Sequence, residues 1–151
     1  MNKLGDLSCN EFLTELASAA PAPGGGGGAA MAGALAAALA SMVANLTIGK
    51  EKFADREPEV KELLEQAEAE RVRLLTLVDE DAAVFNSFMS CYKLPKTTDE
   101  EKAARTAAIR AAAKQAATVP LNIARSSFAV LKLADRLVVA GNPGVITDGA
   151  C

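Results

Sequence analysis

A carboxylate in the middle of an apolar helical stripe is the first feature of this sequence that could do chemistry. Asp81 lies three residues after Val78 and four before Phe85, so helical spacing places it in line with apolar side chains. Burying an unpaired charge costs free energy, so such a residue is paired, exposed or functional. A salt bridge to another helix is the commoner outcome, and a catalytic carboxylate is the functional alternative. Asp79 is expected to point away from the stripe into solvent.

Five consecutive glycines, Gly24 to Gly28, lead directly into an apolar helical segment. Fixing glycine costs backbone entropy, so an ordered run indicates positive φ angles or a close approach of the backbone to another group. The first amides of a helix have no intrahelical partners, so a glycine loop before a helix offers N–H donors to a ligand. Composition alone favours a flexible linker, but the run is short and no polar spacer follows it.

The chain has 151 residues and no histidine, which excludes histidine-based catalytic dyads and His-ligated zinc. Acid–base chemistry must therefore come from carboxylates, Lys, Tyr or Cys. The formal charge of −3 gives no indication that the protein binds nucleic acid or an anionic membrane. The three cysteines, Cys9, Cys91 and Cys151, form no metal-type or redox-type pair. We therefore expect a cytoplasmic protein without a metal.

The sequence is predicted to be all-α, as a single helical bundle with a glycine-rich loop between its first two helices. The expected helices are a short one capped by Ser8 or Asn10, then residues 29–48, 57–94, 98–118 and 121–139. Thr98 and Glu101 fit a capping box, and Pro120 is expected to break or kink the chain. Residues 29–48 carry no charge and are long enough to span a bilayer, but their many alanines favour a buried bundle helix over a membrane span.

Other signals in the sequence are weaker. The glycine run fits neither a P-loop nor a dinucleotide fingerprint. Lys50 and Lys96 could bind an anionic ligand, although lysines at helix ends often only complement the helix dipole. Asp148 lies in a turn-rich tail, where Asp is an ordinary turn residue.

Four segments, taken together and in this order, resemble the cyclodeaminase/cyclohydrolase family of folate enzymes: Pro21–Gly26, Ser41–Lys50, Leu94–Lys102 and Val119–Leu121. That family includes the C-terminal half of formiminotransferase-cyclodeaminase and free-standing bacterial methenyltetrahydrofolate cyclohydrolases. The resemblance covers essentially the whole chain, residues 1–151, and implies an all-helical, dimeric domain. Family members continue into further C-terminal helices, so the resemblance implies either that this sequence is truncated or that the protein lacks those helices.

The resemblance also implies roles for individual residues. The family's catalytic carboxylate falls in a pattern that matches Asp79–Phe85 and selects Asp81. The expected substrate-binding residues follow from the matching segments and are Gly24, Gly25, Gly26, Gly27, Asn45, Lys50, Lys96 and Asp148. Among these, the glycine amides would bind polar atoms of the pterin, and the two lysines would bind the carboxylates of the glutamate tail.

The function that the resemblance implies is methenyltetrahydrofolate cyclohydrolase, which hydrolyses 5,10-methenyltetrahydrofolate to 10-formyltetrahydrofolate. Formiminotetrahydrofolate cyclodeaminase is the alternative, because its reaction passes through an adduct at the same carbon and releases ammonia. A non-catalytic helical interaction module is the alternative from another class. The expected partners are a tetrahydrofolate derivative and a second copy of the chain, with no cofactor beyond the folate itself.

Overall fold

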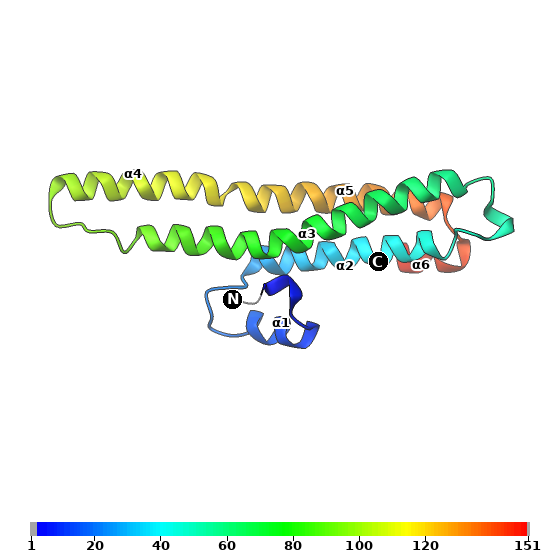
Figure 1. The fold of residues 1–151 in the computed structure, drawn as a ribbon, viewed down its shortest axis with the longest axis horizontal. Coiled ribbons are helices and arrows are strands. Elements are labelled where there is room, and N and C mark those ends of the chain that lie inside the picture. Colours follow the sequence, from blue (N-terminus) through cyan, green and yellow to red (C-terminus); the bar gives the residue numbers. More distant parts are fainter. Residues whose placement is uncertain (1–2, 151) are drawn as a thin grey trace. The chain divides into compact units, whose positions relative to one another are not determined.

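The computed structural model describes residues 3–150, which form two compact units. Unit 1 comprises the described residues up to Ala29 together with Thr76–Ile123, and unit 2 comprises Ala30–Leu75 together with the described residues from Ala124 onward. The regular elements of residues 3–150 are helices (Figure 1), which confirms the all-α prediction. The prediction of a single domain stays a prediction. Cys151 lies outside the described residues.

The helices follow one another in this order: η1 (Leu4–Asp6), α1 (Cys9–Leu16), α2 (Gly25–Asn45), η2 (Glu51–Phe53), α3 (Glu57–Cys91), α4 (Asp99–Ala116), α5 (Thr118–Ala140), η3 (Pro143–Val145) and α6 (Ile146–Ala150).

Two helices begin at capping boxes, of which the sequence predicts the one at Thr98 and Glu101; for the first helix it predicts a cap by Ser8 or Asn10. Ser8 Oγ accepts a hydrogen bond from the amide of Glu11 at 3.3 Å, and the Glu11 carboxylate accepts one from the amide of Ser8 at 3.0 Å. Thr98 and Glu101 form the same reciprocal pair, each at 3.2 Å. Each box satisfies two of the amides that a helix start leaves unpaired. The predicted starts of α1 and α4 are therefore confirmed.

Two predicted boundaries differ from the structure. The glycine run is not a loop, because α2 begins at Gly25 and four of the five glycines form its first turn. The amide of Gly28 donates to Gly24 O at 2.9 Å, which closes that turn. The break near Pro120 lies between α4 and α5, but α5 begins at Thr118, ahead of the proline. Proline is tolerated in a first turn because the amide it lacks would have no intrahelical acceptor there.

Unit 2 is built from three helices that lie side by side, namely α2 from Ala30 onward, the first part of α3 and most of α5 (Figure 1). Their shared core consists of Ala40, Val43, Ala44, Val60, Leu63, Ala67, Leu133, Leu137 and Ala140. Small residues allow the helices to approach closely. A Cβ at Gly33 of α2 would lie 3.2 Å from both methyl carbons of Leu74, and one at Gly141 would lie 2.9 Å from Val43 Cγ1.

Polar contacts join α2 to its neighbours within unit 2. Ser41 Oγ donates to Glu68 Oε1 at 2.6 Å, and Arg71 Nη2 donates to Glu68 Oε2 at 2.7 Å. The Arg71 guanidinium and then the Ser41 hydroxyl hold the pKa of the Glu68 carboxyl below its ordinary value. Thr47 Oγ1 accepts a hydrogen bond from the amide of Asn142 at 2.9 Å, which ties the end of α5 to the end of α2.

Unit 1 contains the second part of α3, with α4 running antiparallel to it (Figure 1). Phe12 of α1 is buried, and Leu16 lies next to the first turn of α2, since a Cβ at Gly28 would meet Leu16 Cδ2 at 3.4 Å. In this unit the apolar stripe of α3 becomes more exposed toward the C-terminal end of the helix. Val78 is fully buried, whereas Phe85 is 38% exposed and Met89 is 44% exposed.

Within residues 3–150, α2 is the one helix whose length and composition would allow it to cross a membrane. Half of its most apolar 18-residue window is buried inside the protein. Core helices of soluble proteins meet the same criteria, and the Ala-rich surface of α2 in unit 2 packs against α3 and α5.

The close contact at Gly141 generates a stability prediction. In Gly141→Ala the new Cβ would lie 2.5 Å from Leu137 O and 2.9 Å from Val43 Cγ1, so α2 and α5 must separate. Overpacking of this kind should lower the free energy of unfolding by about 1–3 kcal/mol. Gly144→Ala is the control, because its Cβ would meet Asn142 Oδ1 at an ordinary 3.4 Å. Urea denaturation of both variants tests this, and equal stabilities would contradict it.

Candidate active site

The side chain of Asp81 on α3 lies against the first turn of α2, within unit 1. Asp81 Oδ2 accepts a hydrogen bond from the amide of Gly27 at 3.0 Å. A helix N-terminus favours a carboxylate because its first amides are unpaired and the helix dipole is positive there. This contact takes the place of the salt bridge that the sequence left open, since Asp81 forms no salt bridge within residues 3–150.

Gly26 leaves the space that the Asp81 carboxylate occupies. A Cβ at Gly26 would lie 2.6 Å from Asp81 Cγ, a distance that real Cβ contacts do not show. A Cβ at Gly24 or Gly25 would meet nothing within 4 Å. The predicted close approach of the backbone is therefore confirmed at Gly26. The other alternative, a positive φ angle, does not occur in this run, because among residues 3–150 only Gly49 has one, at 75°.

The arrangement leaves polar groups free for a ligand. Gly25 and Gly26 are the first two residues of α2, so their amides have no intrahelical acceptor. Asp81 is half-buried, and its Oδ1 has no hydrogen-bond partner within residues 3–150. One carboxylate oxygen is thus held in place by Gly27, while the other remains available to take or give a proton.

Asp79 differs from its prediction. The sequence placed this side chain in solvent, but it is half-buried and its Oδ1 accepts a hydrogen bond from the amide of Leu4 at 2.6 Å. The contact holds η1 against α3 across 75 positions of sequence, which no local pattern predicts. The two carboxylates therefore have separate structural partners.

Lys96 lies in unit 1, beyond the end of α3 and far from Asp81 along the helix axis. It is exposed in the connection that follows α3. The ten residues from Asp81 to Cys91 alone rise about 15 Å along the helix axis. A ligand that reached both residues would have to be elongated.

Asn45, Lys50 and Asp148 belong to unit 2, and all three are exposed. They gather at one end of that unit, because α6 lies against the end of α2. A Cβ at Gly149 would come 3.0 Å from Val43 Cγ2. The predicted site residues therefore fall into two groups, one in each unit.

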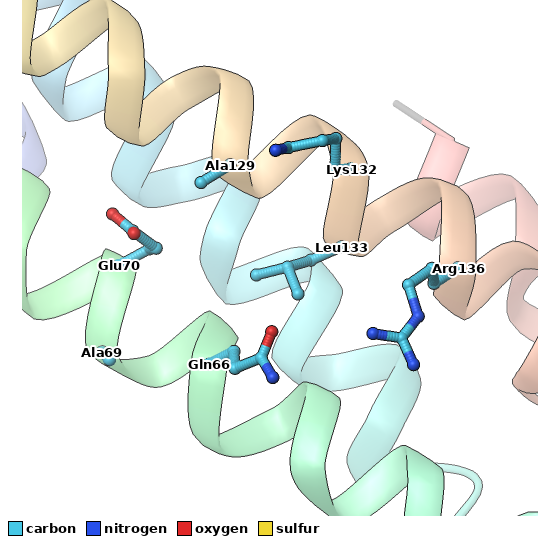
Figure 2. A pocket seen from close by; sticks show the side chains of 7 residues that line it. All are labelled: Gln66, Ala69, Glu70, Ala129, Lys132, Leu133 and Arg136. Carbon is cyan, nitrogen blue, oxygen red and sulfur yellow. The ribbon is translucent and has the colours of Figure 1, made fainter.

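A groove of about 410 Å³ lies between α3 and α5 in unit 2 (Figure 2). Its polar lining includes Glu70, Lys132 and Arg136, with Leu133 between the helices. Glu70 Oε2 is buried without a hydrogen-bond partner among the described residues. None of the residues that the sequence selected for the site lines this groove.

The sequence analysis missed a row of aromatic side chains that follows Asp81, formed by Phe85 and Phe88 on α3 and Tyr92 directly after its end. The Phe88 and Tyr92 rings meet edge to face, with centroids 5.3 Å apart. Arg105 of α4 lies over the Tyr92 ring, with its guanidinium carbon 5.5 Å from the centroid. Helical spacing of the aromatic residues from Asp81 was the available signal, because four, seven and eleven residues separate them from it.

A model of the formiminotransferase-cyclodeaminase family matches residues 8–151 of the chain. The chain belongs to this family. The match confirms the family that the four sequence segments predicted.

Individual relatives show how far the similarity extends. The chain is 48% identical over 144 residues to methenyltetrahydrofolate cyclohydrolase of Methylorubrum extorquens, which covers 95% of the chain and 69% of that protein. It is 36% identical over 143 residues to formimidoyltransferase-cyclodeaminase of Rattus norvegicus, covering 95% of the chain but 26% of that protein. The crystal structure of formiminotetrahydrofolate cyclodeaminase from Thermotoga maritima matches with a TM-score of 0.82 at 33% identity, covering 95% of this chain and 68% of that one.

The contact between Gly26 and Asp81 predicts that neighbouring glycines differ in how well they tolerate a side chain. Gly26→Ala should push the Asp81 carboxylate away from the Gly27 amide, because both groups cannot occupy the same space. Losing this cap should lower the free energy of unfolding by about 1–2 kcal/mol.

Gly25→Ala is the matched control, since its Cβ enters open space. Alanine in the first helical turn should leave stability unchanged or raise it by up to about 1 kcal/mol. Urea denaturation measures both variants, and a Gly26→Ala protein as stable as Gly25→Ala would contradict the assigned contact.

Proposed function

We propose that this chain acts as a methenyltetrahydrofolate cyclohydrolase, which converts 5,10-methenyltetrahydrofolate and water to 10-formyltetrahydrofolate. The observation that carries the proposal is the Asp81 carboxylate, held at the start of α2 by the Gly27 amide with one oxygen left free. The 48% identity to the Methylorubrum cyclohydrolase supports this choice of reaction over the cyclodeaminase reaction, whose named relatives cited above are 33–36% identical.

The substrate needs only modest activation. Its methenyl carbon bridges two nitrogens and carries a delocalised positive charge, so a neighbouring carboxylate attracts it and water can attack it directly. Asp81 takes a proton from the attacking water as the C–O bond forms, which gives a neutral tetrahedral adduct. Asp81 then returns a proton to the pterin-side nitrogen as the bond from that nitrogen to the carbon breaks. The adduct hydroxyl loses its proton to solvent as the formyl C=O forms, so one proton is released overall.

The geometry assigns separate tasks to neighbouring groups. The Gly27 amide holds Asp81 Oδ2, so the proton is carried by Oδ1. The amides of Gly25 and Gly26 point out of the helix start, and they supply donors for polar atoms of the pterin. A cationic substrate is already electrophilic, so the chemistry requires neither a metal nor a further cofactor, and the reaction belongs in the cytoplasm with other folate metabolism.

The remaining predicted residues serve binding in this proposal. Lys96, exposed in unit 1, provides positive charge for the glutamate-tail carboxylates, and the binding roles of Asn45, Lys50 and Asp148 in unit 2 stay predictions.

We further propose that the active form is a homodimer in which α2 packs against a second copy. The outer face of α2 in unit 2 carries Leu35 and Met42, seven residues apart, and Leu46 follows directly after the end of the helix. Their exposures are 66%, 36% and 40%. A row of large apolar side chains on one helix face is typical of a helix–helix interface.

The catalytic role of Asp81 gives the sharpest prediction. Asp81→Asn keeps an oxygen that can accept from the Gly27 amide, so the fold should retain its stability to within about 1 kcal/mol. It removes the base and the negative charge, so turnover should fall about 10²- to 10⁴-fold. Loss of the near-ultraviolet absorbance of the methenyl group at neutral pH measures turnover, and urea denaturation measures stability.

Asp79→Asn is the control, because its oxygen can still accept from the amide of Leu4 and it is not the proposed base. A loss of activity in this variant with full activity in Asp81→Asn would overturn the assignment.

The wild-type assay also tests the alternatives. Formiminotetrahydrofolate converted with release of ammonia, without hydrolysis of the methenyl compound, would indicate a cyclodeaminase. A folded protein that accelerates neither reaction would indicate a non-catalytic interaction module.

The dimer proposal predicts that Leu35→Glu with Met42→Glu produces a monomer, because two carboxylates per copy would be buried in an apolar interface. Light scattering measures the molecular mass of wild type and variant. Gln66→Glu, an exposed change on α3, is the control and should leave the mass of the dimer unchanged. A wild-type mass of one chain would contradict the proposal.

A further inference from the structure

Half of the aromatic residues of this chain lie within residues 85–92, at the end of α3 and directly after it. The sequence has five phenylalanines, one tyrosine and no tryptophan. Three of these six aromatic residues are Phe85 and Phe88 on α3 and Tyr92 directly after its end, at positions four, seven and eleven after Asp81. With 3.6 residues per turn, the side chains of Asp81, Phe85 and Phe88 fall within an arc of about 60° on α3. The face of α3 that carries the candidate base therefore continues as a row of aromatic rings.

These rings are exposed in unit 1. Phe85 is 38% exposed and Tyr92 is 46% exposed, while Phe88 is half-buried. The edge-to-face contact of Phe88 with Tyr92 fixes the orientation of both rings. Exposed aromatic rings held in a fixed orientation offer a surface on which a planar ligand can stack.

The far end of the row is cationic. The Arg105 guanidinium lies over the Tyr92 ring at 5.5 Å, and its Nη2 donates to Tyr92 O at 3.3 Å. Arg105 Nε is buried and has no acceptor among the described residues.

The acidic residues near Arg105 are already engaged. Asp99 pairs with Lys102 at 2.8 Å, and Glu101 accepts from the amides of Thr97 and Thr98. Arg105 keeps its charge for another partner, with Lys96 exposed in the connection before α4.

We propose that this row, Phe85, Phe88 and Tyr92 with Arg105 at its end, binds the p-aminobenzoyl-glutamate portion of the folate. The inference rests on the proposed function and extends it. With the methenyl carbon at Asp81, the benzoyl ring stacks on the aromatic row and the first glutamate carboxylate pairs with Arg105. The eleven residues from Asp81 to Tyr92 rise about 16 Å, which accommodates the ring and the first glutamate.

Isothermal titration calorimetry with the free fragment tests the site without turnover. p-Aminobenzoyl-L-glutamate should bind the wild-type protein, and Arg105→Gln should weaken this binding by on the order of tenfold, the effect of losing one charge-assisted hydrogen bond. p-Aminobenzoate lacks the glutamate carboxylates, and Arg105→Gln should leave its weaker binding unchanged. Phe85→Leu should weaken both ligands, because it removes stacking surface. Arg110→Gln, an exposed change on the same helix, is the matched control and should alter neither.

Kinetics on the full substrate give a second measurement. Arg105→Gln should raise KM by on the order of tenfold with little change in kcat, and Arg105→Lys, which keeps the charge, should recover part of the loss. Equal binding of the fragment to wild type and Arg105→Gln, or unchanged KM in both Arg105 variants, would overturn the proposal. So would a change of oligomeric state in Phe85→Leu without loss of ligand binding, since the row would then be a protein interface.

The two proposals fail in different ways. Fragment binding that depends on Arg105, in a wild-type protein that does not hydrolyse the methenyl compound, would overturn the cyclohydrolase function but support the binding row. Hydrolysis by a wild-type protein that does not bind the fragment would overturn the row alone.

Discussion

The hydrogen bond from the Gly27 amide to Asp81 Oδ2 determines both the start of α2 and the position of the candidate base. Four glycines open this helix, and each is about 1 kcal/mol less favourable there than alanine. A carboxylate from α3 supplies the partner that the helix start lacks. It can reach the amide only because Gly26 has no side chain. The residue type that weakens the helix locally is therefore the one that allows the tertiary contact that stabilises it.

Small residues also determine how closely the helices of unit 2 pack. Its three helices meet through alanines, valines and leucines, and Gly33 and Gly141 stand where a side chain would collide with a neighbouring helix. Small residues on the inner face leave the large apolar residues of α2, such as Leu35, on its outer face. Few aromatic rings are needed for packing. Phe12 and Phe53 are buried, whereas the rings that follow Asp81 are left at the surface of α3, where they can contact a ligand.

The chemistry fits the limited set of catalytic side chains. A chain without histidine lacks the side chain whose ordinary pKa lies closest to neutral, and the proposed base is a carboxylate. A substrate whose reacting carbon already carries positive charge needs no stronger base. The same carboxylate both attracts the cation and transfers the proton, so one well-positioned residue is enough for the proposed reaction.

Local signals in the sequence predicted the helices and the key carboxylate, because those signals act over one or two turns. Thr98 with Glu101 marked a helix start through contacts three residues apart, and Ser8 was one of two candidate caps for the first helix. The period of 3.6 residues placed Asp81 among apolar positions, and the resemblance to the folate-enzyme family selected it as the candidate base. Boundaries failed where distant contacts overrode local preference, as at the glycine run, which propensity alone assigns to a loop.

Only the tertiary structure decided which partner each carboxylate has. Asp81 meets an amide 54 positions away, and Asp79 meets one 75 positions away. Periodicity gives the direction of a side chain from its own helix, but not which backbone packs against it. For the same reason the sequence treated Gly25 and Gly26 alike, whereas packing makes one of them open to substitution and leaves no room for a side chain at the other.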